Sequence, residues 1–277
     1  GELYHEVNWI INNTYKTQKS FQCLKGFLIR KLNNLLLVAS KLLLDLFTCV
    51  ENSVFHCANW QVQMLGNLMI LVTGASGLLG QHVLAELTAR GKKVRALYRN
   101  HIPTLYHSIP SSLLDWVEGD LLDVPSLQDA MQEVTQVFHC AAMVSYDKRF
   151  QEEMQEVNVT GTAHLVNCCL EKPNLRLVHV SSIATLGGGL PEKLINEENR
   201  WQESESHSNY AVSKYRAELE VWRGIAEGLQ AVIVNPGIIL GKGDPSRSST
   251  NLFELVRNEF PYFTEGVTGW EIGRAHV

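Results

Sequence analysis

The chain has 277 residues, of which 45% are hydrophobic and 19% charged, and its formal net charge is −5 at pH 7. This composition can bury a sizeable core and excludes a wholly disordered chain. The negative charge argues against a nucleic-acid-binding protein that works by neutralising phosphates. No uninterrupted apolar run reaches the roughly 18 residues that a membrane span needs. The six cysteines show neither metal-ligand nor disulfide spacing. We therefore expect a cytoplasmic protein without a membrane span.

Residues 1–67 differ in composition from the sequence after them. They contain eight asparagines but only three glycines, and they lack the turn residues that separate strands from helices in a compact α/β unit. Leucines recur at helical spacing between Leu28 and Leu46. One interpretation of this segment is therefore an amphipathic anchor or partner helix. The alternative is translated upstream sequence, which the positions of Met64 and Met69 favour. We predict a non-domain leader over residues 1–67.

From Met69 onward, short β-branched runs alternate with helical patterns. This alternation predicts a doubly wound parallel sheet, the Rossmann α/β fold, over residues 68–242. Ligands of such sheets bind at the carboxyl ends of the strands. The predicted strands are Met69–Thr73, Lys93–Tyr98, Trp116–Val117, Gln136–Cys140, Arg176–Ser181 and Ala231–Asn235. The main predicted helices are Leu78–Arg90, Met154–Leu170 and Tyr210–Glu227.

A glycine-rich turn stands between the first strand and the first helix. Gly74, Gly77 and Gly80 have the spacing G-x-x-G-x-x-G. The first glycine permits a tight turn, the second lets the backbone approach a pyrophosphate, and the third lets the helix pack close to the sheet. The helix N-terminus adds oriented N–H donors. This turn predicts a dinucleotide site, with cofactor-binding residues Gly74, Ser76, Gly77, Leu78, Leu79 and Gly80.

The end of the second strand bears on the choice of dinucleotide. An NAD site usually places an acidic residue there to bind the ribose hydroxyls. Here the strand ends in Leu97-Tyr98-Arg99-Asn100, without a carboxylate. Arg99 is suited to hold a 2′-phosphate through charge-assisted hydrogen bonds. Arg95, inside the strand, is interpreted as a surface residue. We predict NADP as the cofactor, with NAD as the alternative.

A tyrosine and a lysine follow at helical spacing. Tyr210 and Lys214 are four residues apart and therefore lie on one face of a helix. A nearby ammonium and an oxidised nicotinamide both favour a phenolate, which would lower the pKa of the tyrosine and make it a general acid or base. Ser182 follows the fifth strand, at the edge where a nicotinamide would lie, and its hydroxyl can orient a substrate carbonyl.

Together these motifs resemble the extended short-chain dehydrogenase/reductase family, over about residues 69–270. Further matching motifs begin at Gly119, His139, Asn158 and Asn235. The resemblance implies Ser182, Tyr210 and Lys214 as the catalytic set, with Lys214 also on the nicotinamide ribose. It further implies cofactor contacts from Asp120, Leu121, Ala141, Ala142, Asn158, Pro236 and Gly237. The second strand is similar to that of the NADP-dependent, dihydroflavonol-reductase-like branch.

We therefore expect an NADP-dependent oxidoreductase that reduces a carbonyl, or oxidises an alcohol, of a small organic substrate. The alternatives are a nucleotide-sugar epimerase or dehydratase with bound NAD, and a non-catalytic dinucleotide-binding protein. A homodimer is left open. Residues 243–270 are predicted to begin a truncated C-terminal substrate domain. Ile272–Val277 is what ATCGGAAGAGCACACGTC encodes, a string that resembles a sequencing adapter, so residues 271–277 are predicted to be an adapter-derived tail.

Overall fold

Six parallel strands form a single sheet in the structure, a computed structural model that describes residues 68–100, 102, 112–187, 201, 207–237 and 239. The strand order is β3-β2-β1-β4-β5-β6, and all five neighbouring pairs are parallel. This is the doubly wound order, so the predicted fold class is confirmed. The strands are β1 (Met69–Thr73), β2 (Lys93–Tyr98), β3 (Leu114–Glu118), β4 (Val134–His139), β5 (Arg176–Val180) and β6 (Gln230–Val234).

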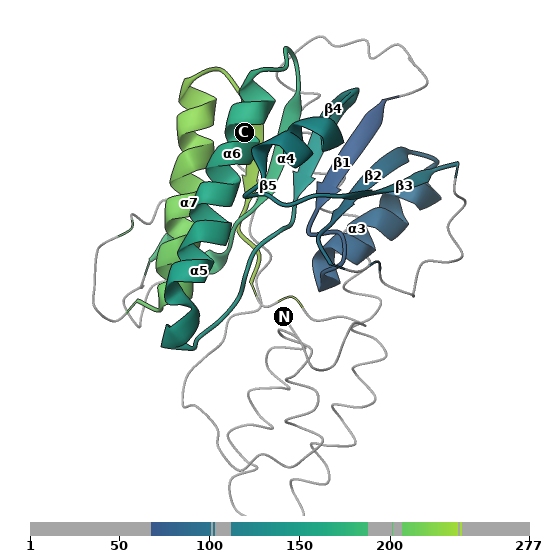
Figure 1. Cartoon of the computed structure of the whole chain (residues 1–277). Helices are drawn as coiled ribbons and strands as arrows, with labels where there is room; N and C mark the ends of the chain where they lie inside the picture. Colours follow the sequence, from purple (N-terminus) through teal and green to yellow (C-terminus); the bar gives the residue numbers. More distant parts are fainter. Residues whose placement is uncertain are drawn as a thin grey trace, which may run out of the picture. The chain divides into compact units, whose positions relative to one another are not determined.

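Helices cover both faces of this sheet. Figure 1 shows α4, α6 and α7 side by side over one face, and a right-handed β1–α3–β2 connection puts α3 on the other face. The helices are α3 (Leu78–Ala89), α4 (Val124–Ala130), α5 (Gln151–Gln155), α6 (Gly161–Leu170) and α7 (Asn209–Ala226). A π-helical turn, Glu156–Thr160, joins α5 to α6, where the sequence predicts one continuous helix.

The core lies between the sheet and the α4, α6 and α7 layer. Strand β1 reads Met-Ile-Leu-Val-Thr and is buried from Ile70 onward, as expected for a parallel strand covered on both faces. Leu71 and Val137 from neighbouring strands pack with Leu165 and Val221 from the helices, and all four are fully buried. This packing holds the carboxyl ends of β1, β4 and β5 at one edge of the sheet.

The strand registers align that edge. Thr73 of β1 is paired with His139 of β4, and His139 is paired with His179 of β5. The chain segments that leave these strands therefore start side by side. Among the described residues, no helix is long and apolar enough to cross a membrane. The predicted leader (1–67), the substrate-domain segment (243–270) and the tail (271–277) lie outside the described residues.

Candidate active site

The glycine turn is shaped by close backbone contacts. Gly74 has a φ of +65°, and a Cβ there would lie 2.6 Å from backbone atoms of Ala141, just beyond β4. A Cβ on Gly80 would lie 2.1 Å from the carbonyl oxygen of Gly74. Neither position has room for a side chain, because the atoms it would meet are backbone. The turn is therefore folded tightly against both its own helix and the neighbouring strand end.

The remaining glycine of the motif faces outward. Gly77 is exposed, and a Cβ there would meet only the Gly74 carbonyl oxygen, at 3.2 Å. Helix α3 starts directly after it, with no side-chain N-cap and no acidic residue in its first turn. Gln81 donates to the Ser76 carbonyl over 2.8 Å and holds the turn in place. An uncapped helix start with an exposed glycine fits the pyrophosphate of a dinucleotide.

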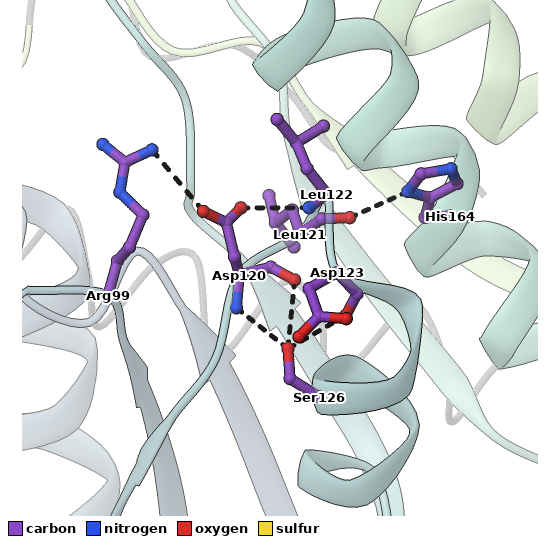
Figure 2. A network of polar contacts seen from close by, with 7 residues as sticks. All are labelled: Arg99, Asp120, Leu121, Leu122, Asp123, Ser126 and His164. Carbon is purple, nitrogen blue, oxygen red and sulfur yellow. Dashed lines mark hydrogen bonds and ion pairs between the residues drawn. The ribbon is translucent and has the colours of Figure 1, made fainter.

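The ends of β2 and β3 bring two of the predicted cofactor residues together. Figure 2 shows Arg99 pointing toward Asp120, whose Oδ2 lies 3.7 Å from the Arg99 Nη1. The other carboxylate oxygen of Asp120 accepts a hydrogen bond from the Leu122 amide at 3.0 Å. The Leu121 carbonyl is bonded to His164 of α6 at 2.9 Å. The Arg99 side chain is 54% exposed, and an ion pair of this length and exposure is weak, so Arg99 can turn toward a ligand.

The structure corrects the interpretation of Arg95. Its side chain is only 15% exposed, and its Nε donates to Asp115 over 2.9 Å. Its Nη1 donates to the carbonyls of Ala130 and Gln132 at the end of α4. Arg95 therefore ties β2 to β3 and to the end of α4 and is not a surface residue. Its donors are committed within the protein, which leaves Arg99 as the arginine available at this strand end.

The chain after β4 runs along the same edge of the sheet. His139 is 1% exposed, and its ring is bonded to the hydroxyls of Thr73, at 2.7 Å, and Thr162, at 3.0 Å. Burial lowers the pKa of His139 to about 3, and the charge of Lys214 adds to that shift. His139 is thus a neutral packing residue, while the following Ala141 is half-buried and Ala142 is exposed.

Two hydroxyl groups from different elements meet beyond β5. Tyr210, in the first turn of α7, lies close to the side chain of Ser182. Burial raises the pKa of Tyr210, and the nearby Ser182 hydroxyl opposes that shift. The predicted lowering of this pKa involves an oxidised nicotinamide as well as Lys214, so it stays a prediction for the cofactor complex. The structure does bring the predicted serine and tyrosine together.

Lys214 lies one turn further along α7 and is almost completely buried. It is 1% exposed, and its Nζ donates to the Val180 carbonyl at the end of β5 over 2.8 Å. Burial lowers the pKa of Lys214 to about 8, against the opposing effects of Glu218 and Cys140. Burying an ammonium group costs free energy unless the group is paired and hydrogen-bonded. Here it is held at the strand edge, beneath the loop that carries Ser182.

Asn158 connects the loop after β4 to α7. It lies in the π-helical turn and is 2% exposed. Its amide nitrogen donates to the Met143 carbonyl and to the Ser213 hydroxyl, and its oxygen accepts from the Met143 amide at 2.7 Å. Its predicted contact with the cofactor stays a prediction.

Comparisons with known proteins identify the family of the chain. Residues 70–266 match the model of the NAD dependent epimerase/dehydratase family. The chain belongs to this family. It is 32% identical over 198 residues to sterol demethylase protein B of Methylococcus capsulatus, covering 71% of this chain and 60% of that protein. It is 29% identical to the dihydroflavonol 4-reductase of Arabidopsis thaliana, covering 70% of this chain and 56% of that one.

Solved structures of the epimerase/dehydratase family show the same fold. The UDP-glucose 4-epimerase of Thermus thermophilus in complex with NAD is 28% identical, with a TM-score of 0.58, over 68% of this chain and 61% of that one. A short-chain dehydrogenase/reductase from Agrobacterium tumefaciens with bound NAD is 29% identical, with a TM-score of 0.51, over 60% and 48%. The chain thus spans only about half to 60% of the relatives it matches.

The family assignment confirms the predicted resemblance to the extended short-chain dehydrogenase/reductase family. Sequence analysis missed one feature of the site, however. Glu218 of α7 bonds to residues after β5 and after β6. It lies four residues beyond Lys214 and eight beyond Tyr210, so the helical spacing that singled out those two could also have identified it.

Proposed function

We propose that the protein reduces a carbonyl group of a small organic substrate, or oxidises the corresponding alcohol. The observation that carries this proposal is that Ser182 and Tyr210, from different elements, lie close enough for the serine hydroxyl to lower the pKa of the tyrosine. Both groups lie next to the carboxyl end of β5, where a doubly wound sheet binds its ligand. Two hydroxyls that converge in this way can hold one carbonyl oxygen between them.

Each residue of this group has its own part in the reaction. The nicotinamide cofactor, when bound, supplies the hydride or accepts it in the reverse direction. Ser182 donates a hydrogen bond to the substrate oxygen and orients it. Tyr210 donates its proton to that oxygen in reduction and takes a proton from the alcohol in oxidation. Lys214 binds the nicotinamide ribose with the donors that its bond to Val180 leaves over, and its charge favours the phenolate of Tyr210.

We propose NADP as the preferred cofactor, held at its 2′-phosphate by Arg99. Support comes from the strand end itself: β2 is followed by an exposed arginine, and the nearest described carboxylate, on Asp120, is held 3.7 Å from it. A phosphate would give Arg99 a stronger, charge-assisted partner than this ion pair. Asp120, Leu121, Ala141, Ala142, Pro236 and Gly237 are proposed to line the rest of the cofactor, beyond the glycine turn.

One alternative has an observation in its favour. The match to a UDP-glucose 4-epimerase in complex with NAD supports an epimerase or dehydratase that keeps its cofactor bound. The two enzymes differ in cofactor exchange, because a reductase releases its cofactor in each turnover and an epimerase retains it. Purified protein that carries NAD through gel filtration supports the epimerase. A non-catalytic dinucleotide-binding protein has no use for the Ser182, Tyr210 and Lys214 set.

We also propose that the protein acts in a reducing compartment, on small molecules rather than nucleic acid. The three cysteines in the described part of the chain, Cys140, Cys168 and Cys169, are all free. A homodimer, and the domain boundaries around residues 68–242, stay predictions.

The proposed function is tested with NADPH and NADH against a panel of aldehydes and ketones, followed by absorbance at the nicotinamide band. We expect turnover with NADPH in excess of that with NADH. Turnover by the Tyr210→Phe variant at the wild-type rate would contradict the assigned proton donor. A cofactor that stays bound and is never consumed would contradict the reductase.

A further inference from the structure

The carboxylate of Glu218 collects hydrogen bonds from three separate chain segments. Its Oε2 accepts from the Ser181 hydroxyl at 2.5 Å, after β5, and from the Thr185 hydroxyl at 2.8 Å, in the short helix Ile183–Leu186. The same oxygen accepts from the Asn235 amide at 3.0 Å, after β6. Its Oε1 accepts from the Trp222 indole at 3.2 Å. One side chain of α7 thus joins the ends of two strands.

Two of these partners also hold the backbone of Ser182. The Asn235 amide donates to the Ser182 carbonyl at 3.2 Å. The Thr185 hydroxyl lies 2.8 Å from that carbonyl and 2.8 Å from Glu218 Oε2, and its single proton can be donated to either acceptor. Thr185 and Asn235 are each 4% exposed, so water cannot replace these bonds freely. A short chain of buried hydrogen bonds therefore leads from the carboxylate on α7 to the backbone of Ser182.

This link matters because it connects the two elements that carry the proposed catalytic side chains. Helix α7 carries Tyr210, Lys214 and Glu218 on successive turns, whereas Ser182 belongs to the loop after β5. For Ser182 and Tyr210 to act on one substrate oxygen, that loop and helix must keep their relative position. The link through Glu218 is made of charge-assisted bonds to a carboxylate, which are stronger and shorter than neutral ones.

We propose that Glu218 is a positioning residue that sets the Ser182 hydroxyl against Tyr210. This inference rests on the proposed function, in which these two hydroxyls hold the substrate oxygen. Glu218 itself contacts neither hydroxyl, and it acts through Ser181, Thr185 and Asn235.

The charge of Glu218 adds a second effect. The groups that face Lys214 are His139 and Cys140 at the end of β4, His179 of β5, and Glu218 on its own helix. Burial keeps the two histidines neutral and raises the pKa of the Cys140 thiol to about 12. Among the described residues around Lys214, the Glu218 carboxylate, one turn further along α7, is therefore the anion that favours the ammonium. Loss of this carboxylate lowers the pKa of Lys214 further, and activity that needs the ammonium should then fall at a lower pH.

The test combines a substrate-free measurement with kinetics on the whole protein. Because the nearby Ser182 hydroxyl lowers the pKa of Tyr210, Glu218→Ala should raise that pKa by displacing Ser182. The pKa is measured by NMR with ¹³Cζ-labelled tyrosine and assigned with Tyr210→Phe. With NADPH and 4-nitrobenzaldehyde as the probe, kcat should fall on the order of 10- to 100-fold, as expected for a misplaced catalytic group. The dissociation constant for NADPH should stay within about twofold of the wild-type value, since Glu218 is assigned no contact with the cofactor.

Two further variants keep this test decisive. Thr185→Val removes only the hydroxyl between Glu218 and Ser182, and should shift the Tyr210 pKa and kcat in the same direction by less. Glu220→Ala, on the same helix but paired with Arg223, and Thr88→Val, whose hydroxyl bonds within its own helix, should change neither. An unchanged Tyr210 pKa in Glu218→Ala, or in Thr185→Val if the first variant does not fold, overturns the positioning role. Equal kcat for wild type and Tyr210→Phe instead overturns the proposed function.

Discussion

The two halves of the site are built in different ways. The glycine turn between β1 and α3 is shaped by backbone that leaves no room for side chains, since a Cβ on Gly80 would lie 2.1 Å from another residue's carbonyl. The catalytic half, between β5, β6 and α7, is held by side chains such as Glu218 and Asn235 that bond across elements. The glycine turn depends on the absence of side chains, and the catalytic half depends on side chains that hydrogen bonds hold in position. Substitutions should therefore damage the two halves differently.

The largest expected effect is on chemistry in the catalytic half. Tyr210→Phe removes the proton donor and should reduce turnover by about a hundredfold or more, the usual scale of general acid–base catalysis. Cofactor affinity should be nearly unchanged, because the ring is retained. The control is Tyr215→Phe, whose ring stacks on Trp201 at 4.4 Å and should keep its packing. Steady-state kinetics and NADPH titration of both variants decide the matter, and near-normal turnover of Tyr210→Phe would place the proton donor elsewhere.

The cofactor half should respond in affinity instead. Arg99→Ala should weaken NADP binding by about 1.5–3 kcal/mol, the range for hydrogen bonds to charged groups, and should change NAD binding little. Arg90→Ala removes the same charge from the end of α3, where Arg90 pairs with Glu86, and serves as the control. Titration calorimetry with both dinucleotides measures the difference. Equal losses for NADP and NAD in Arg99→Ala would contradict the 2′-phosphate assignment.

Within the glycine turn, two substitutions of the same size should separate folding from binding. Gly80→Ala forces a methyl group onto backbone and should lower the free energy of unfolding by about 1–3 kcal/mol, as overpacking does. Gly77→Ala places its methyl at an exposed position and should change that free energy by less than about 0.5 kcal/mol, while weakening NADPH binding. Urea unfolding and NADPH titration of both variants test this. Equal unfolding free energies for the two would show that the turn relaxes.

The buried histidines at the boundary of the two halves predict an acid-sensitive fold. Burial lowers the pKa of His139 and His179 below 6.5, so the unfolded chain binds more protons and stability falls as the pH falls below that value. Between pH 7 and pH 5, His139, whose pKa burial lowers to about 3, should cost about 2 kcal/mol. Burial lowers the pKa of His179 as well, so His179→Phe should lose less stability than the wild type over that interval. Urea unfolding at both pH values measures it, and equal losses would contradict the neutral, buried state of His179.

The sequence was most informative where the structure depends on local pattern. Strands β1 and β2 have the predicted bounds, because their apolar runs are flanked by turn residues. The glycine spacing likewise follows directly from the close backbone contacts that leave no room for a side chain at Gly74 and Gly80. Ser182 was identified from its place after the fifth predicted strand, and Tyr210 from its helical spacing to Lys214.

Features that depend on tertiary contacts were missed or misplaced. Helix α4 was not predicted, since its seven residues are too few to show a hydrophobic period. Arg95 was interpreted as a surface residue, because the carbonyls that bind it come from residues 35 and 37 positions away. The bonds of Asn158 to Met143 and Ser213 were not predicted, because these partners lie 15 and 55 positions away; its contact with the cofactor stays a prediction. No local pattern contains such partners.

The π-helical turn at Glu156–Thr160 has a consequence for insertions and deletions. A π turn has one residue more than an α-helical turn of the same span, and each residue of a helix advances the side-chain direction by about 100°. Deleting Val157 should therefore restore a regular helix through α5 and α6 and rotate Asn158 away from Met143 and Ser213. The loop after β4 would then lose its tie to α7, even though no side chain in either had been altered. At this point of the chain, the number of residues matters as much as their identity.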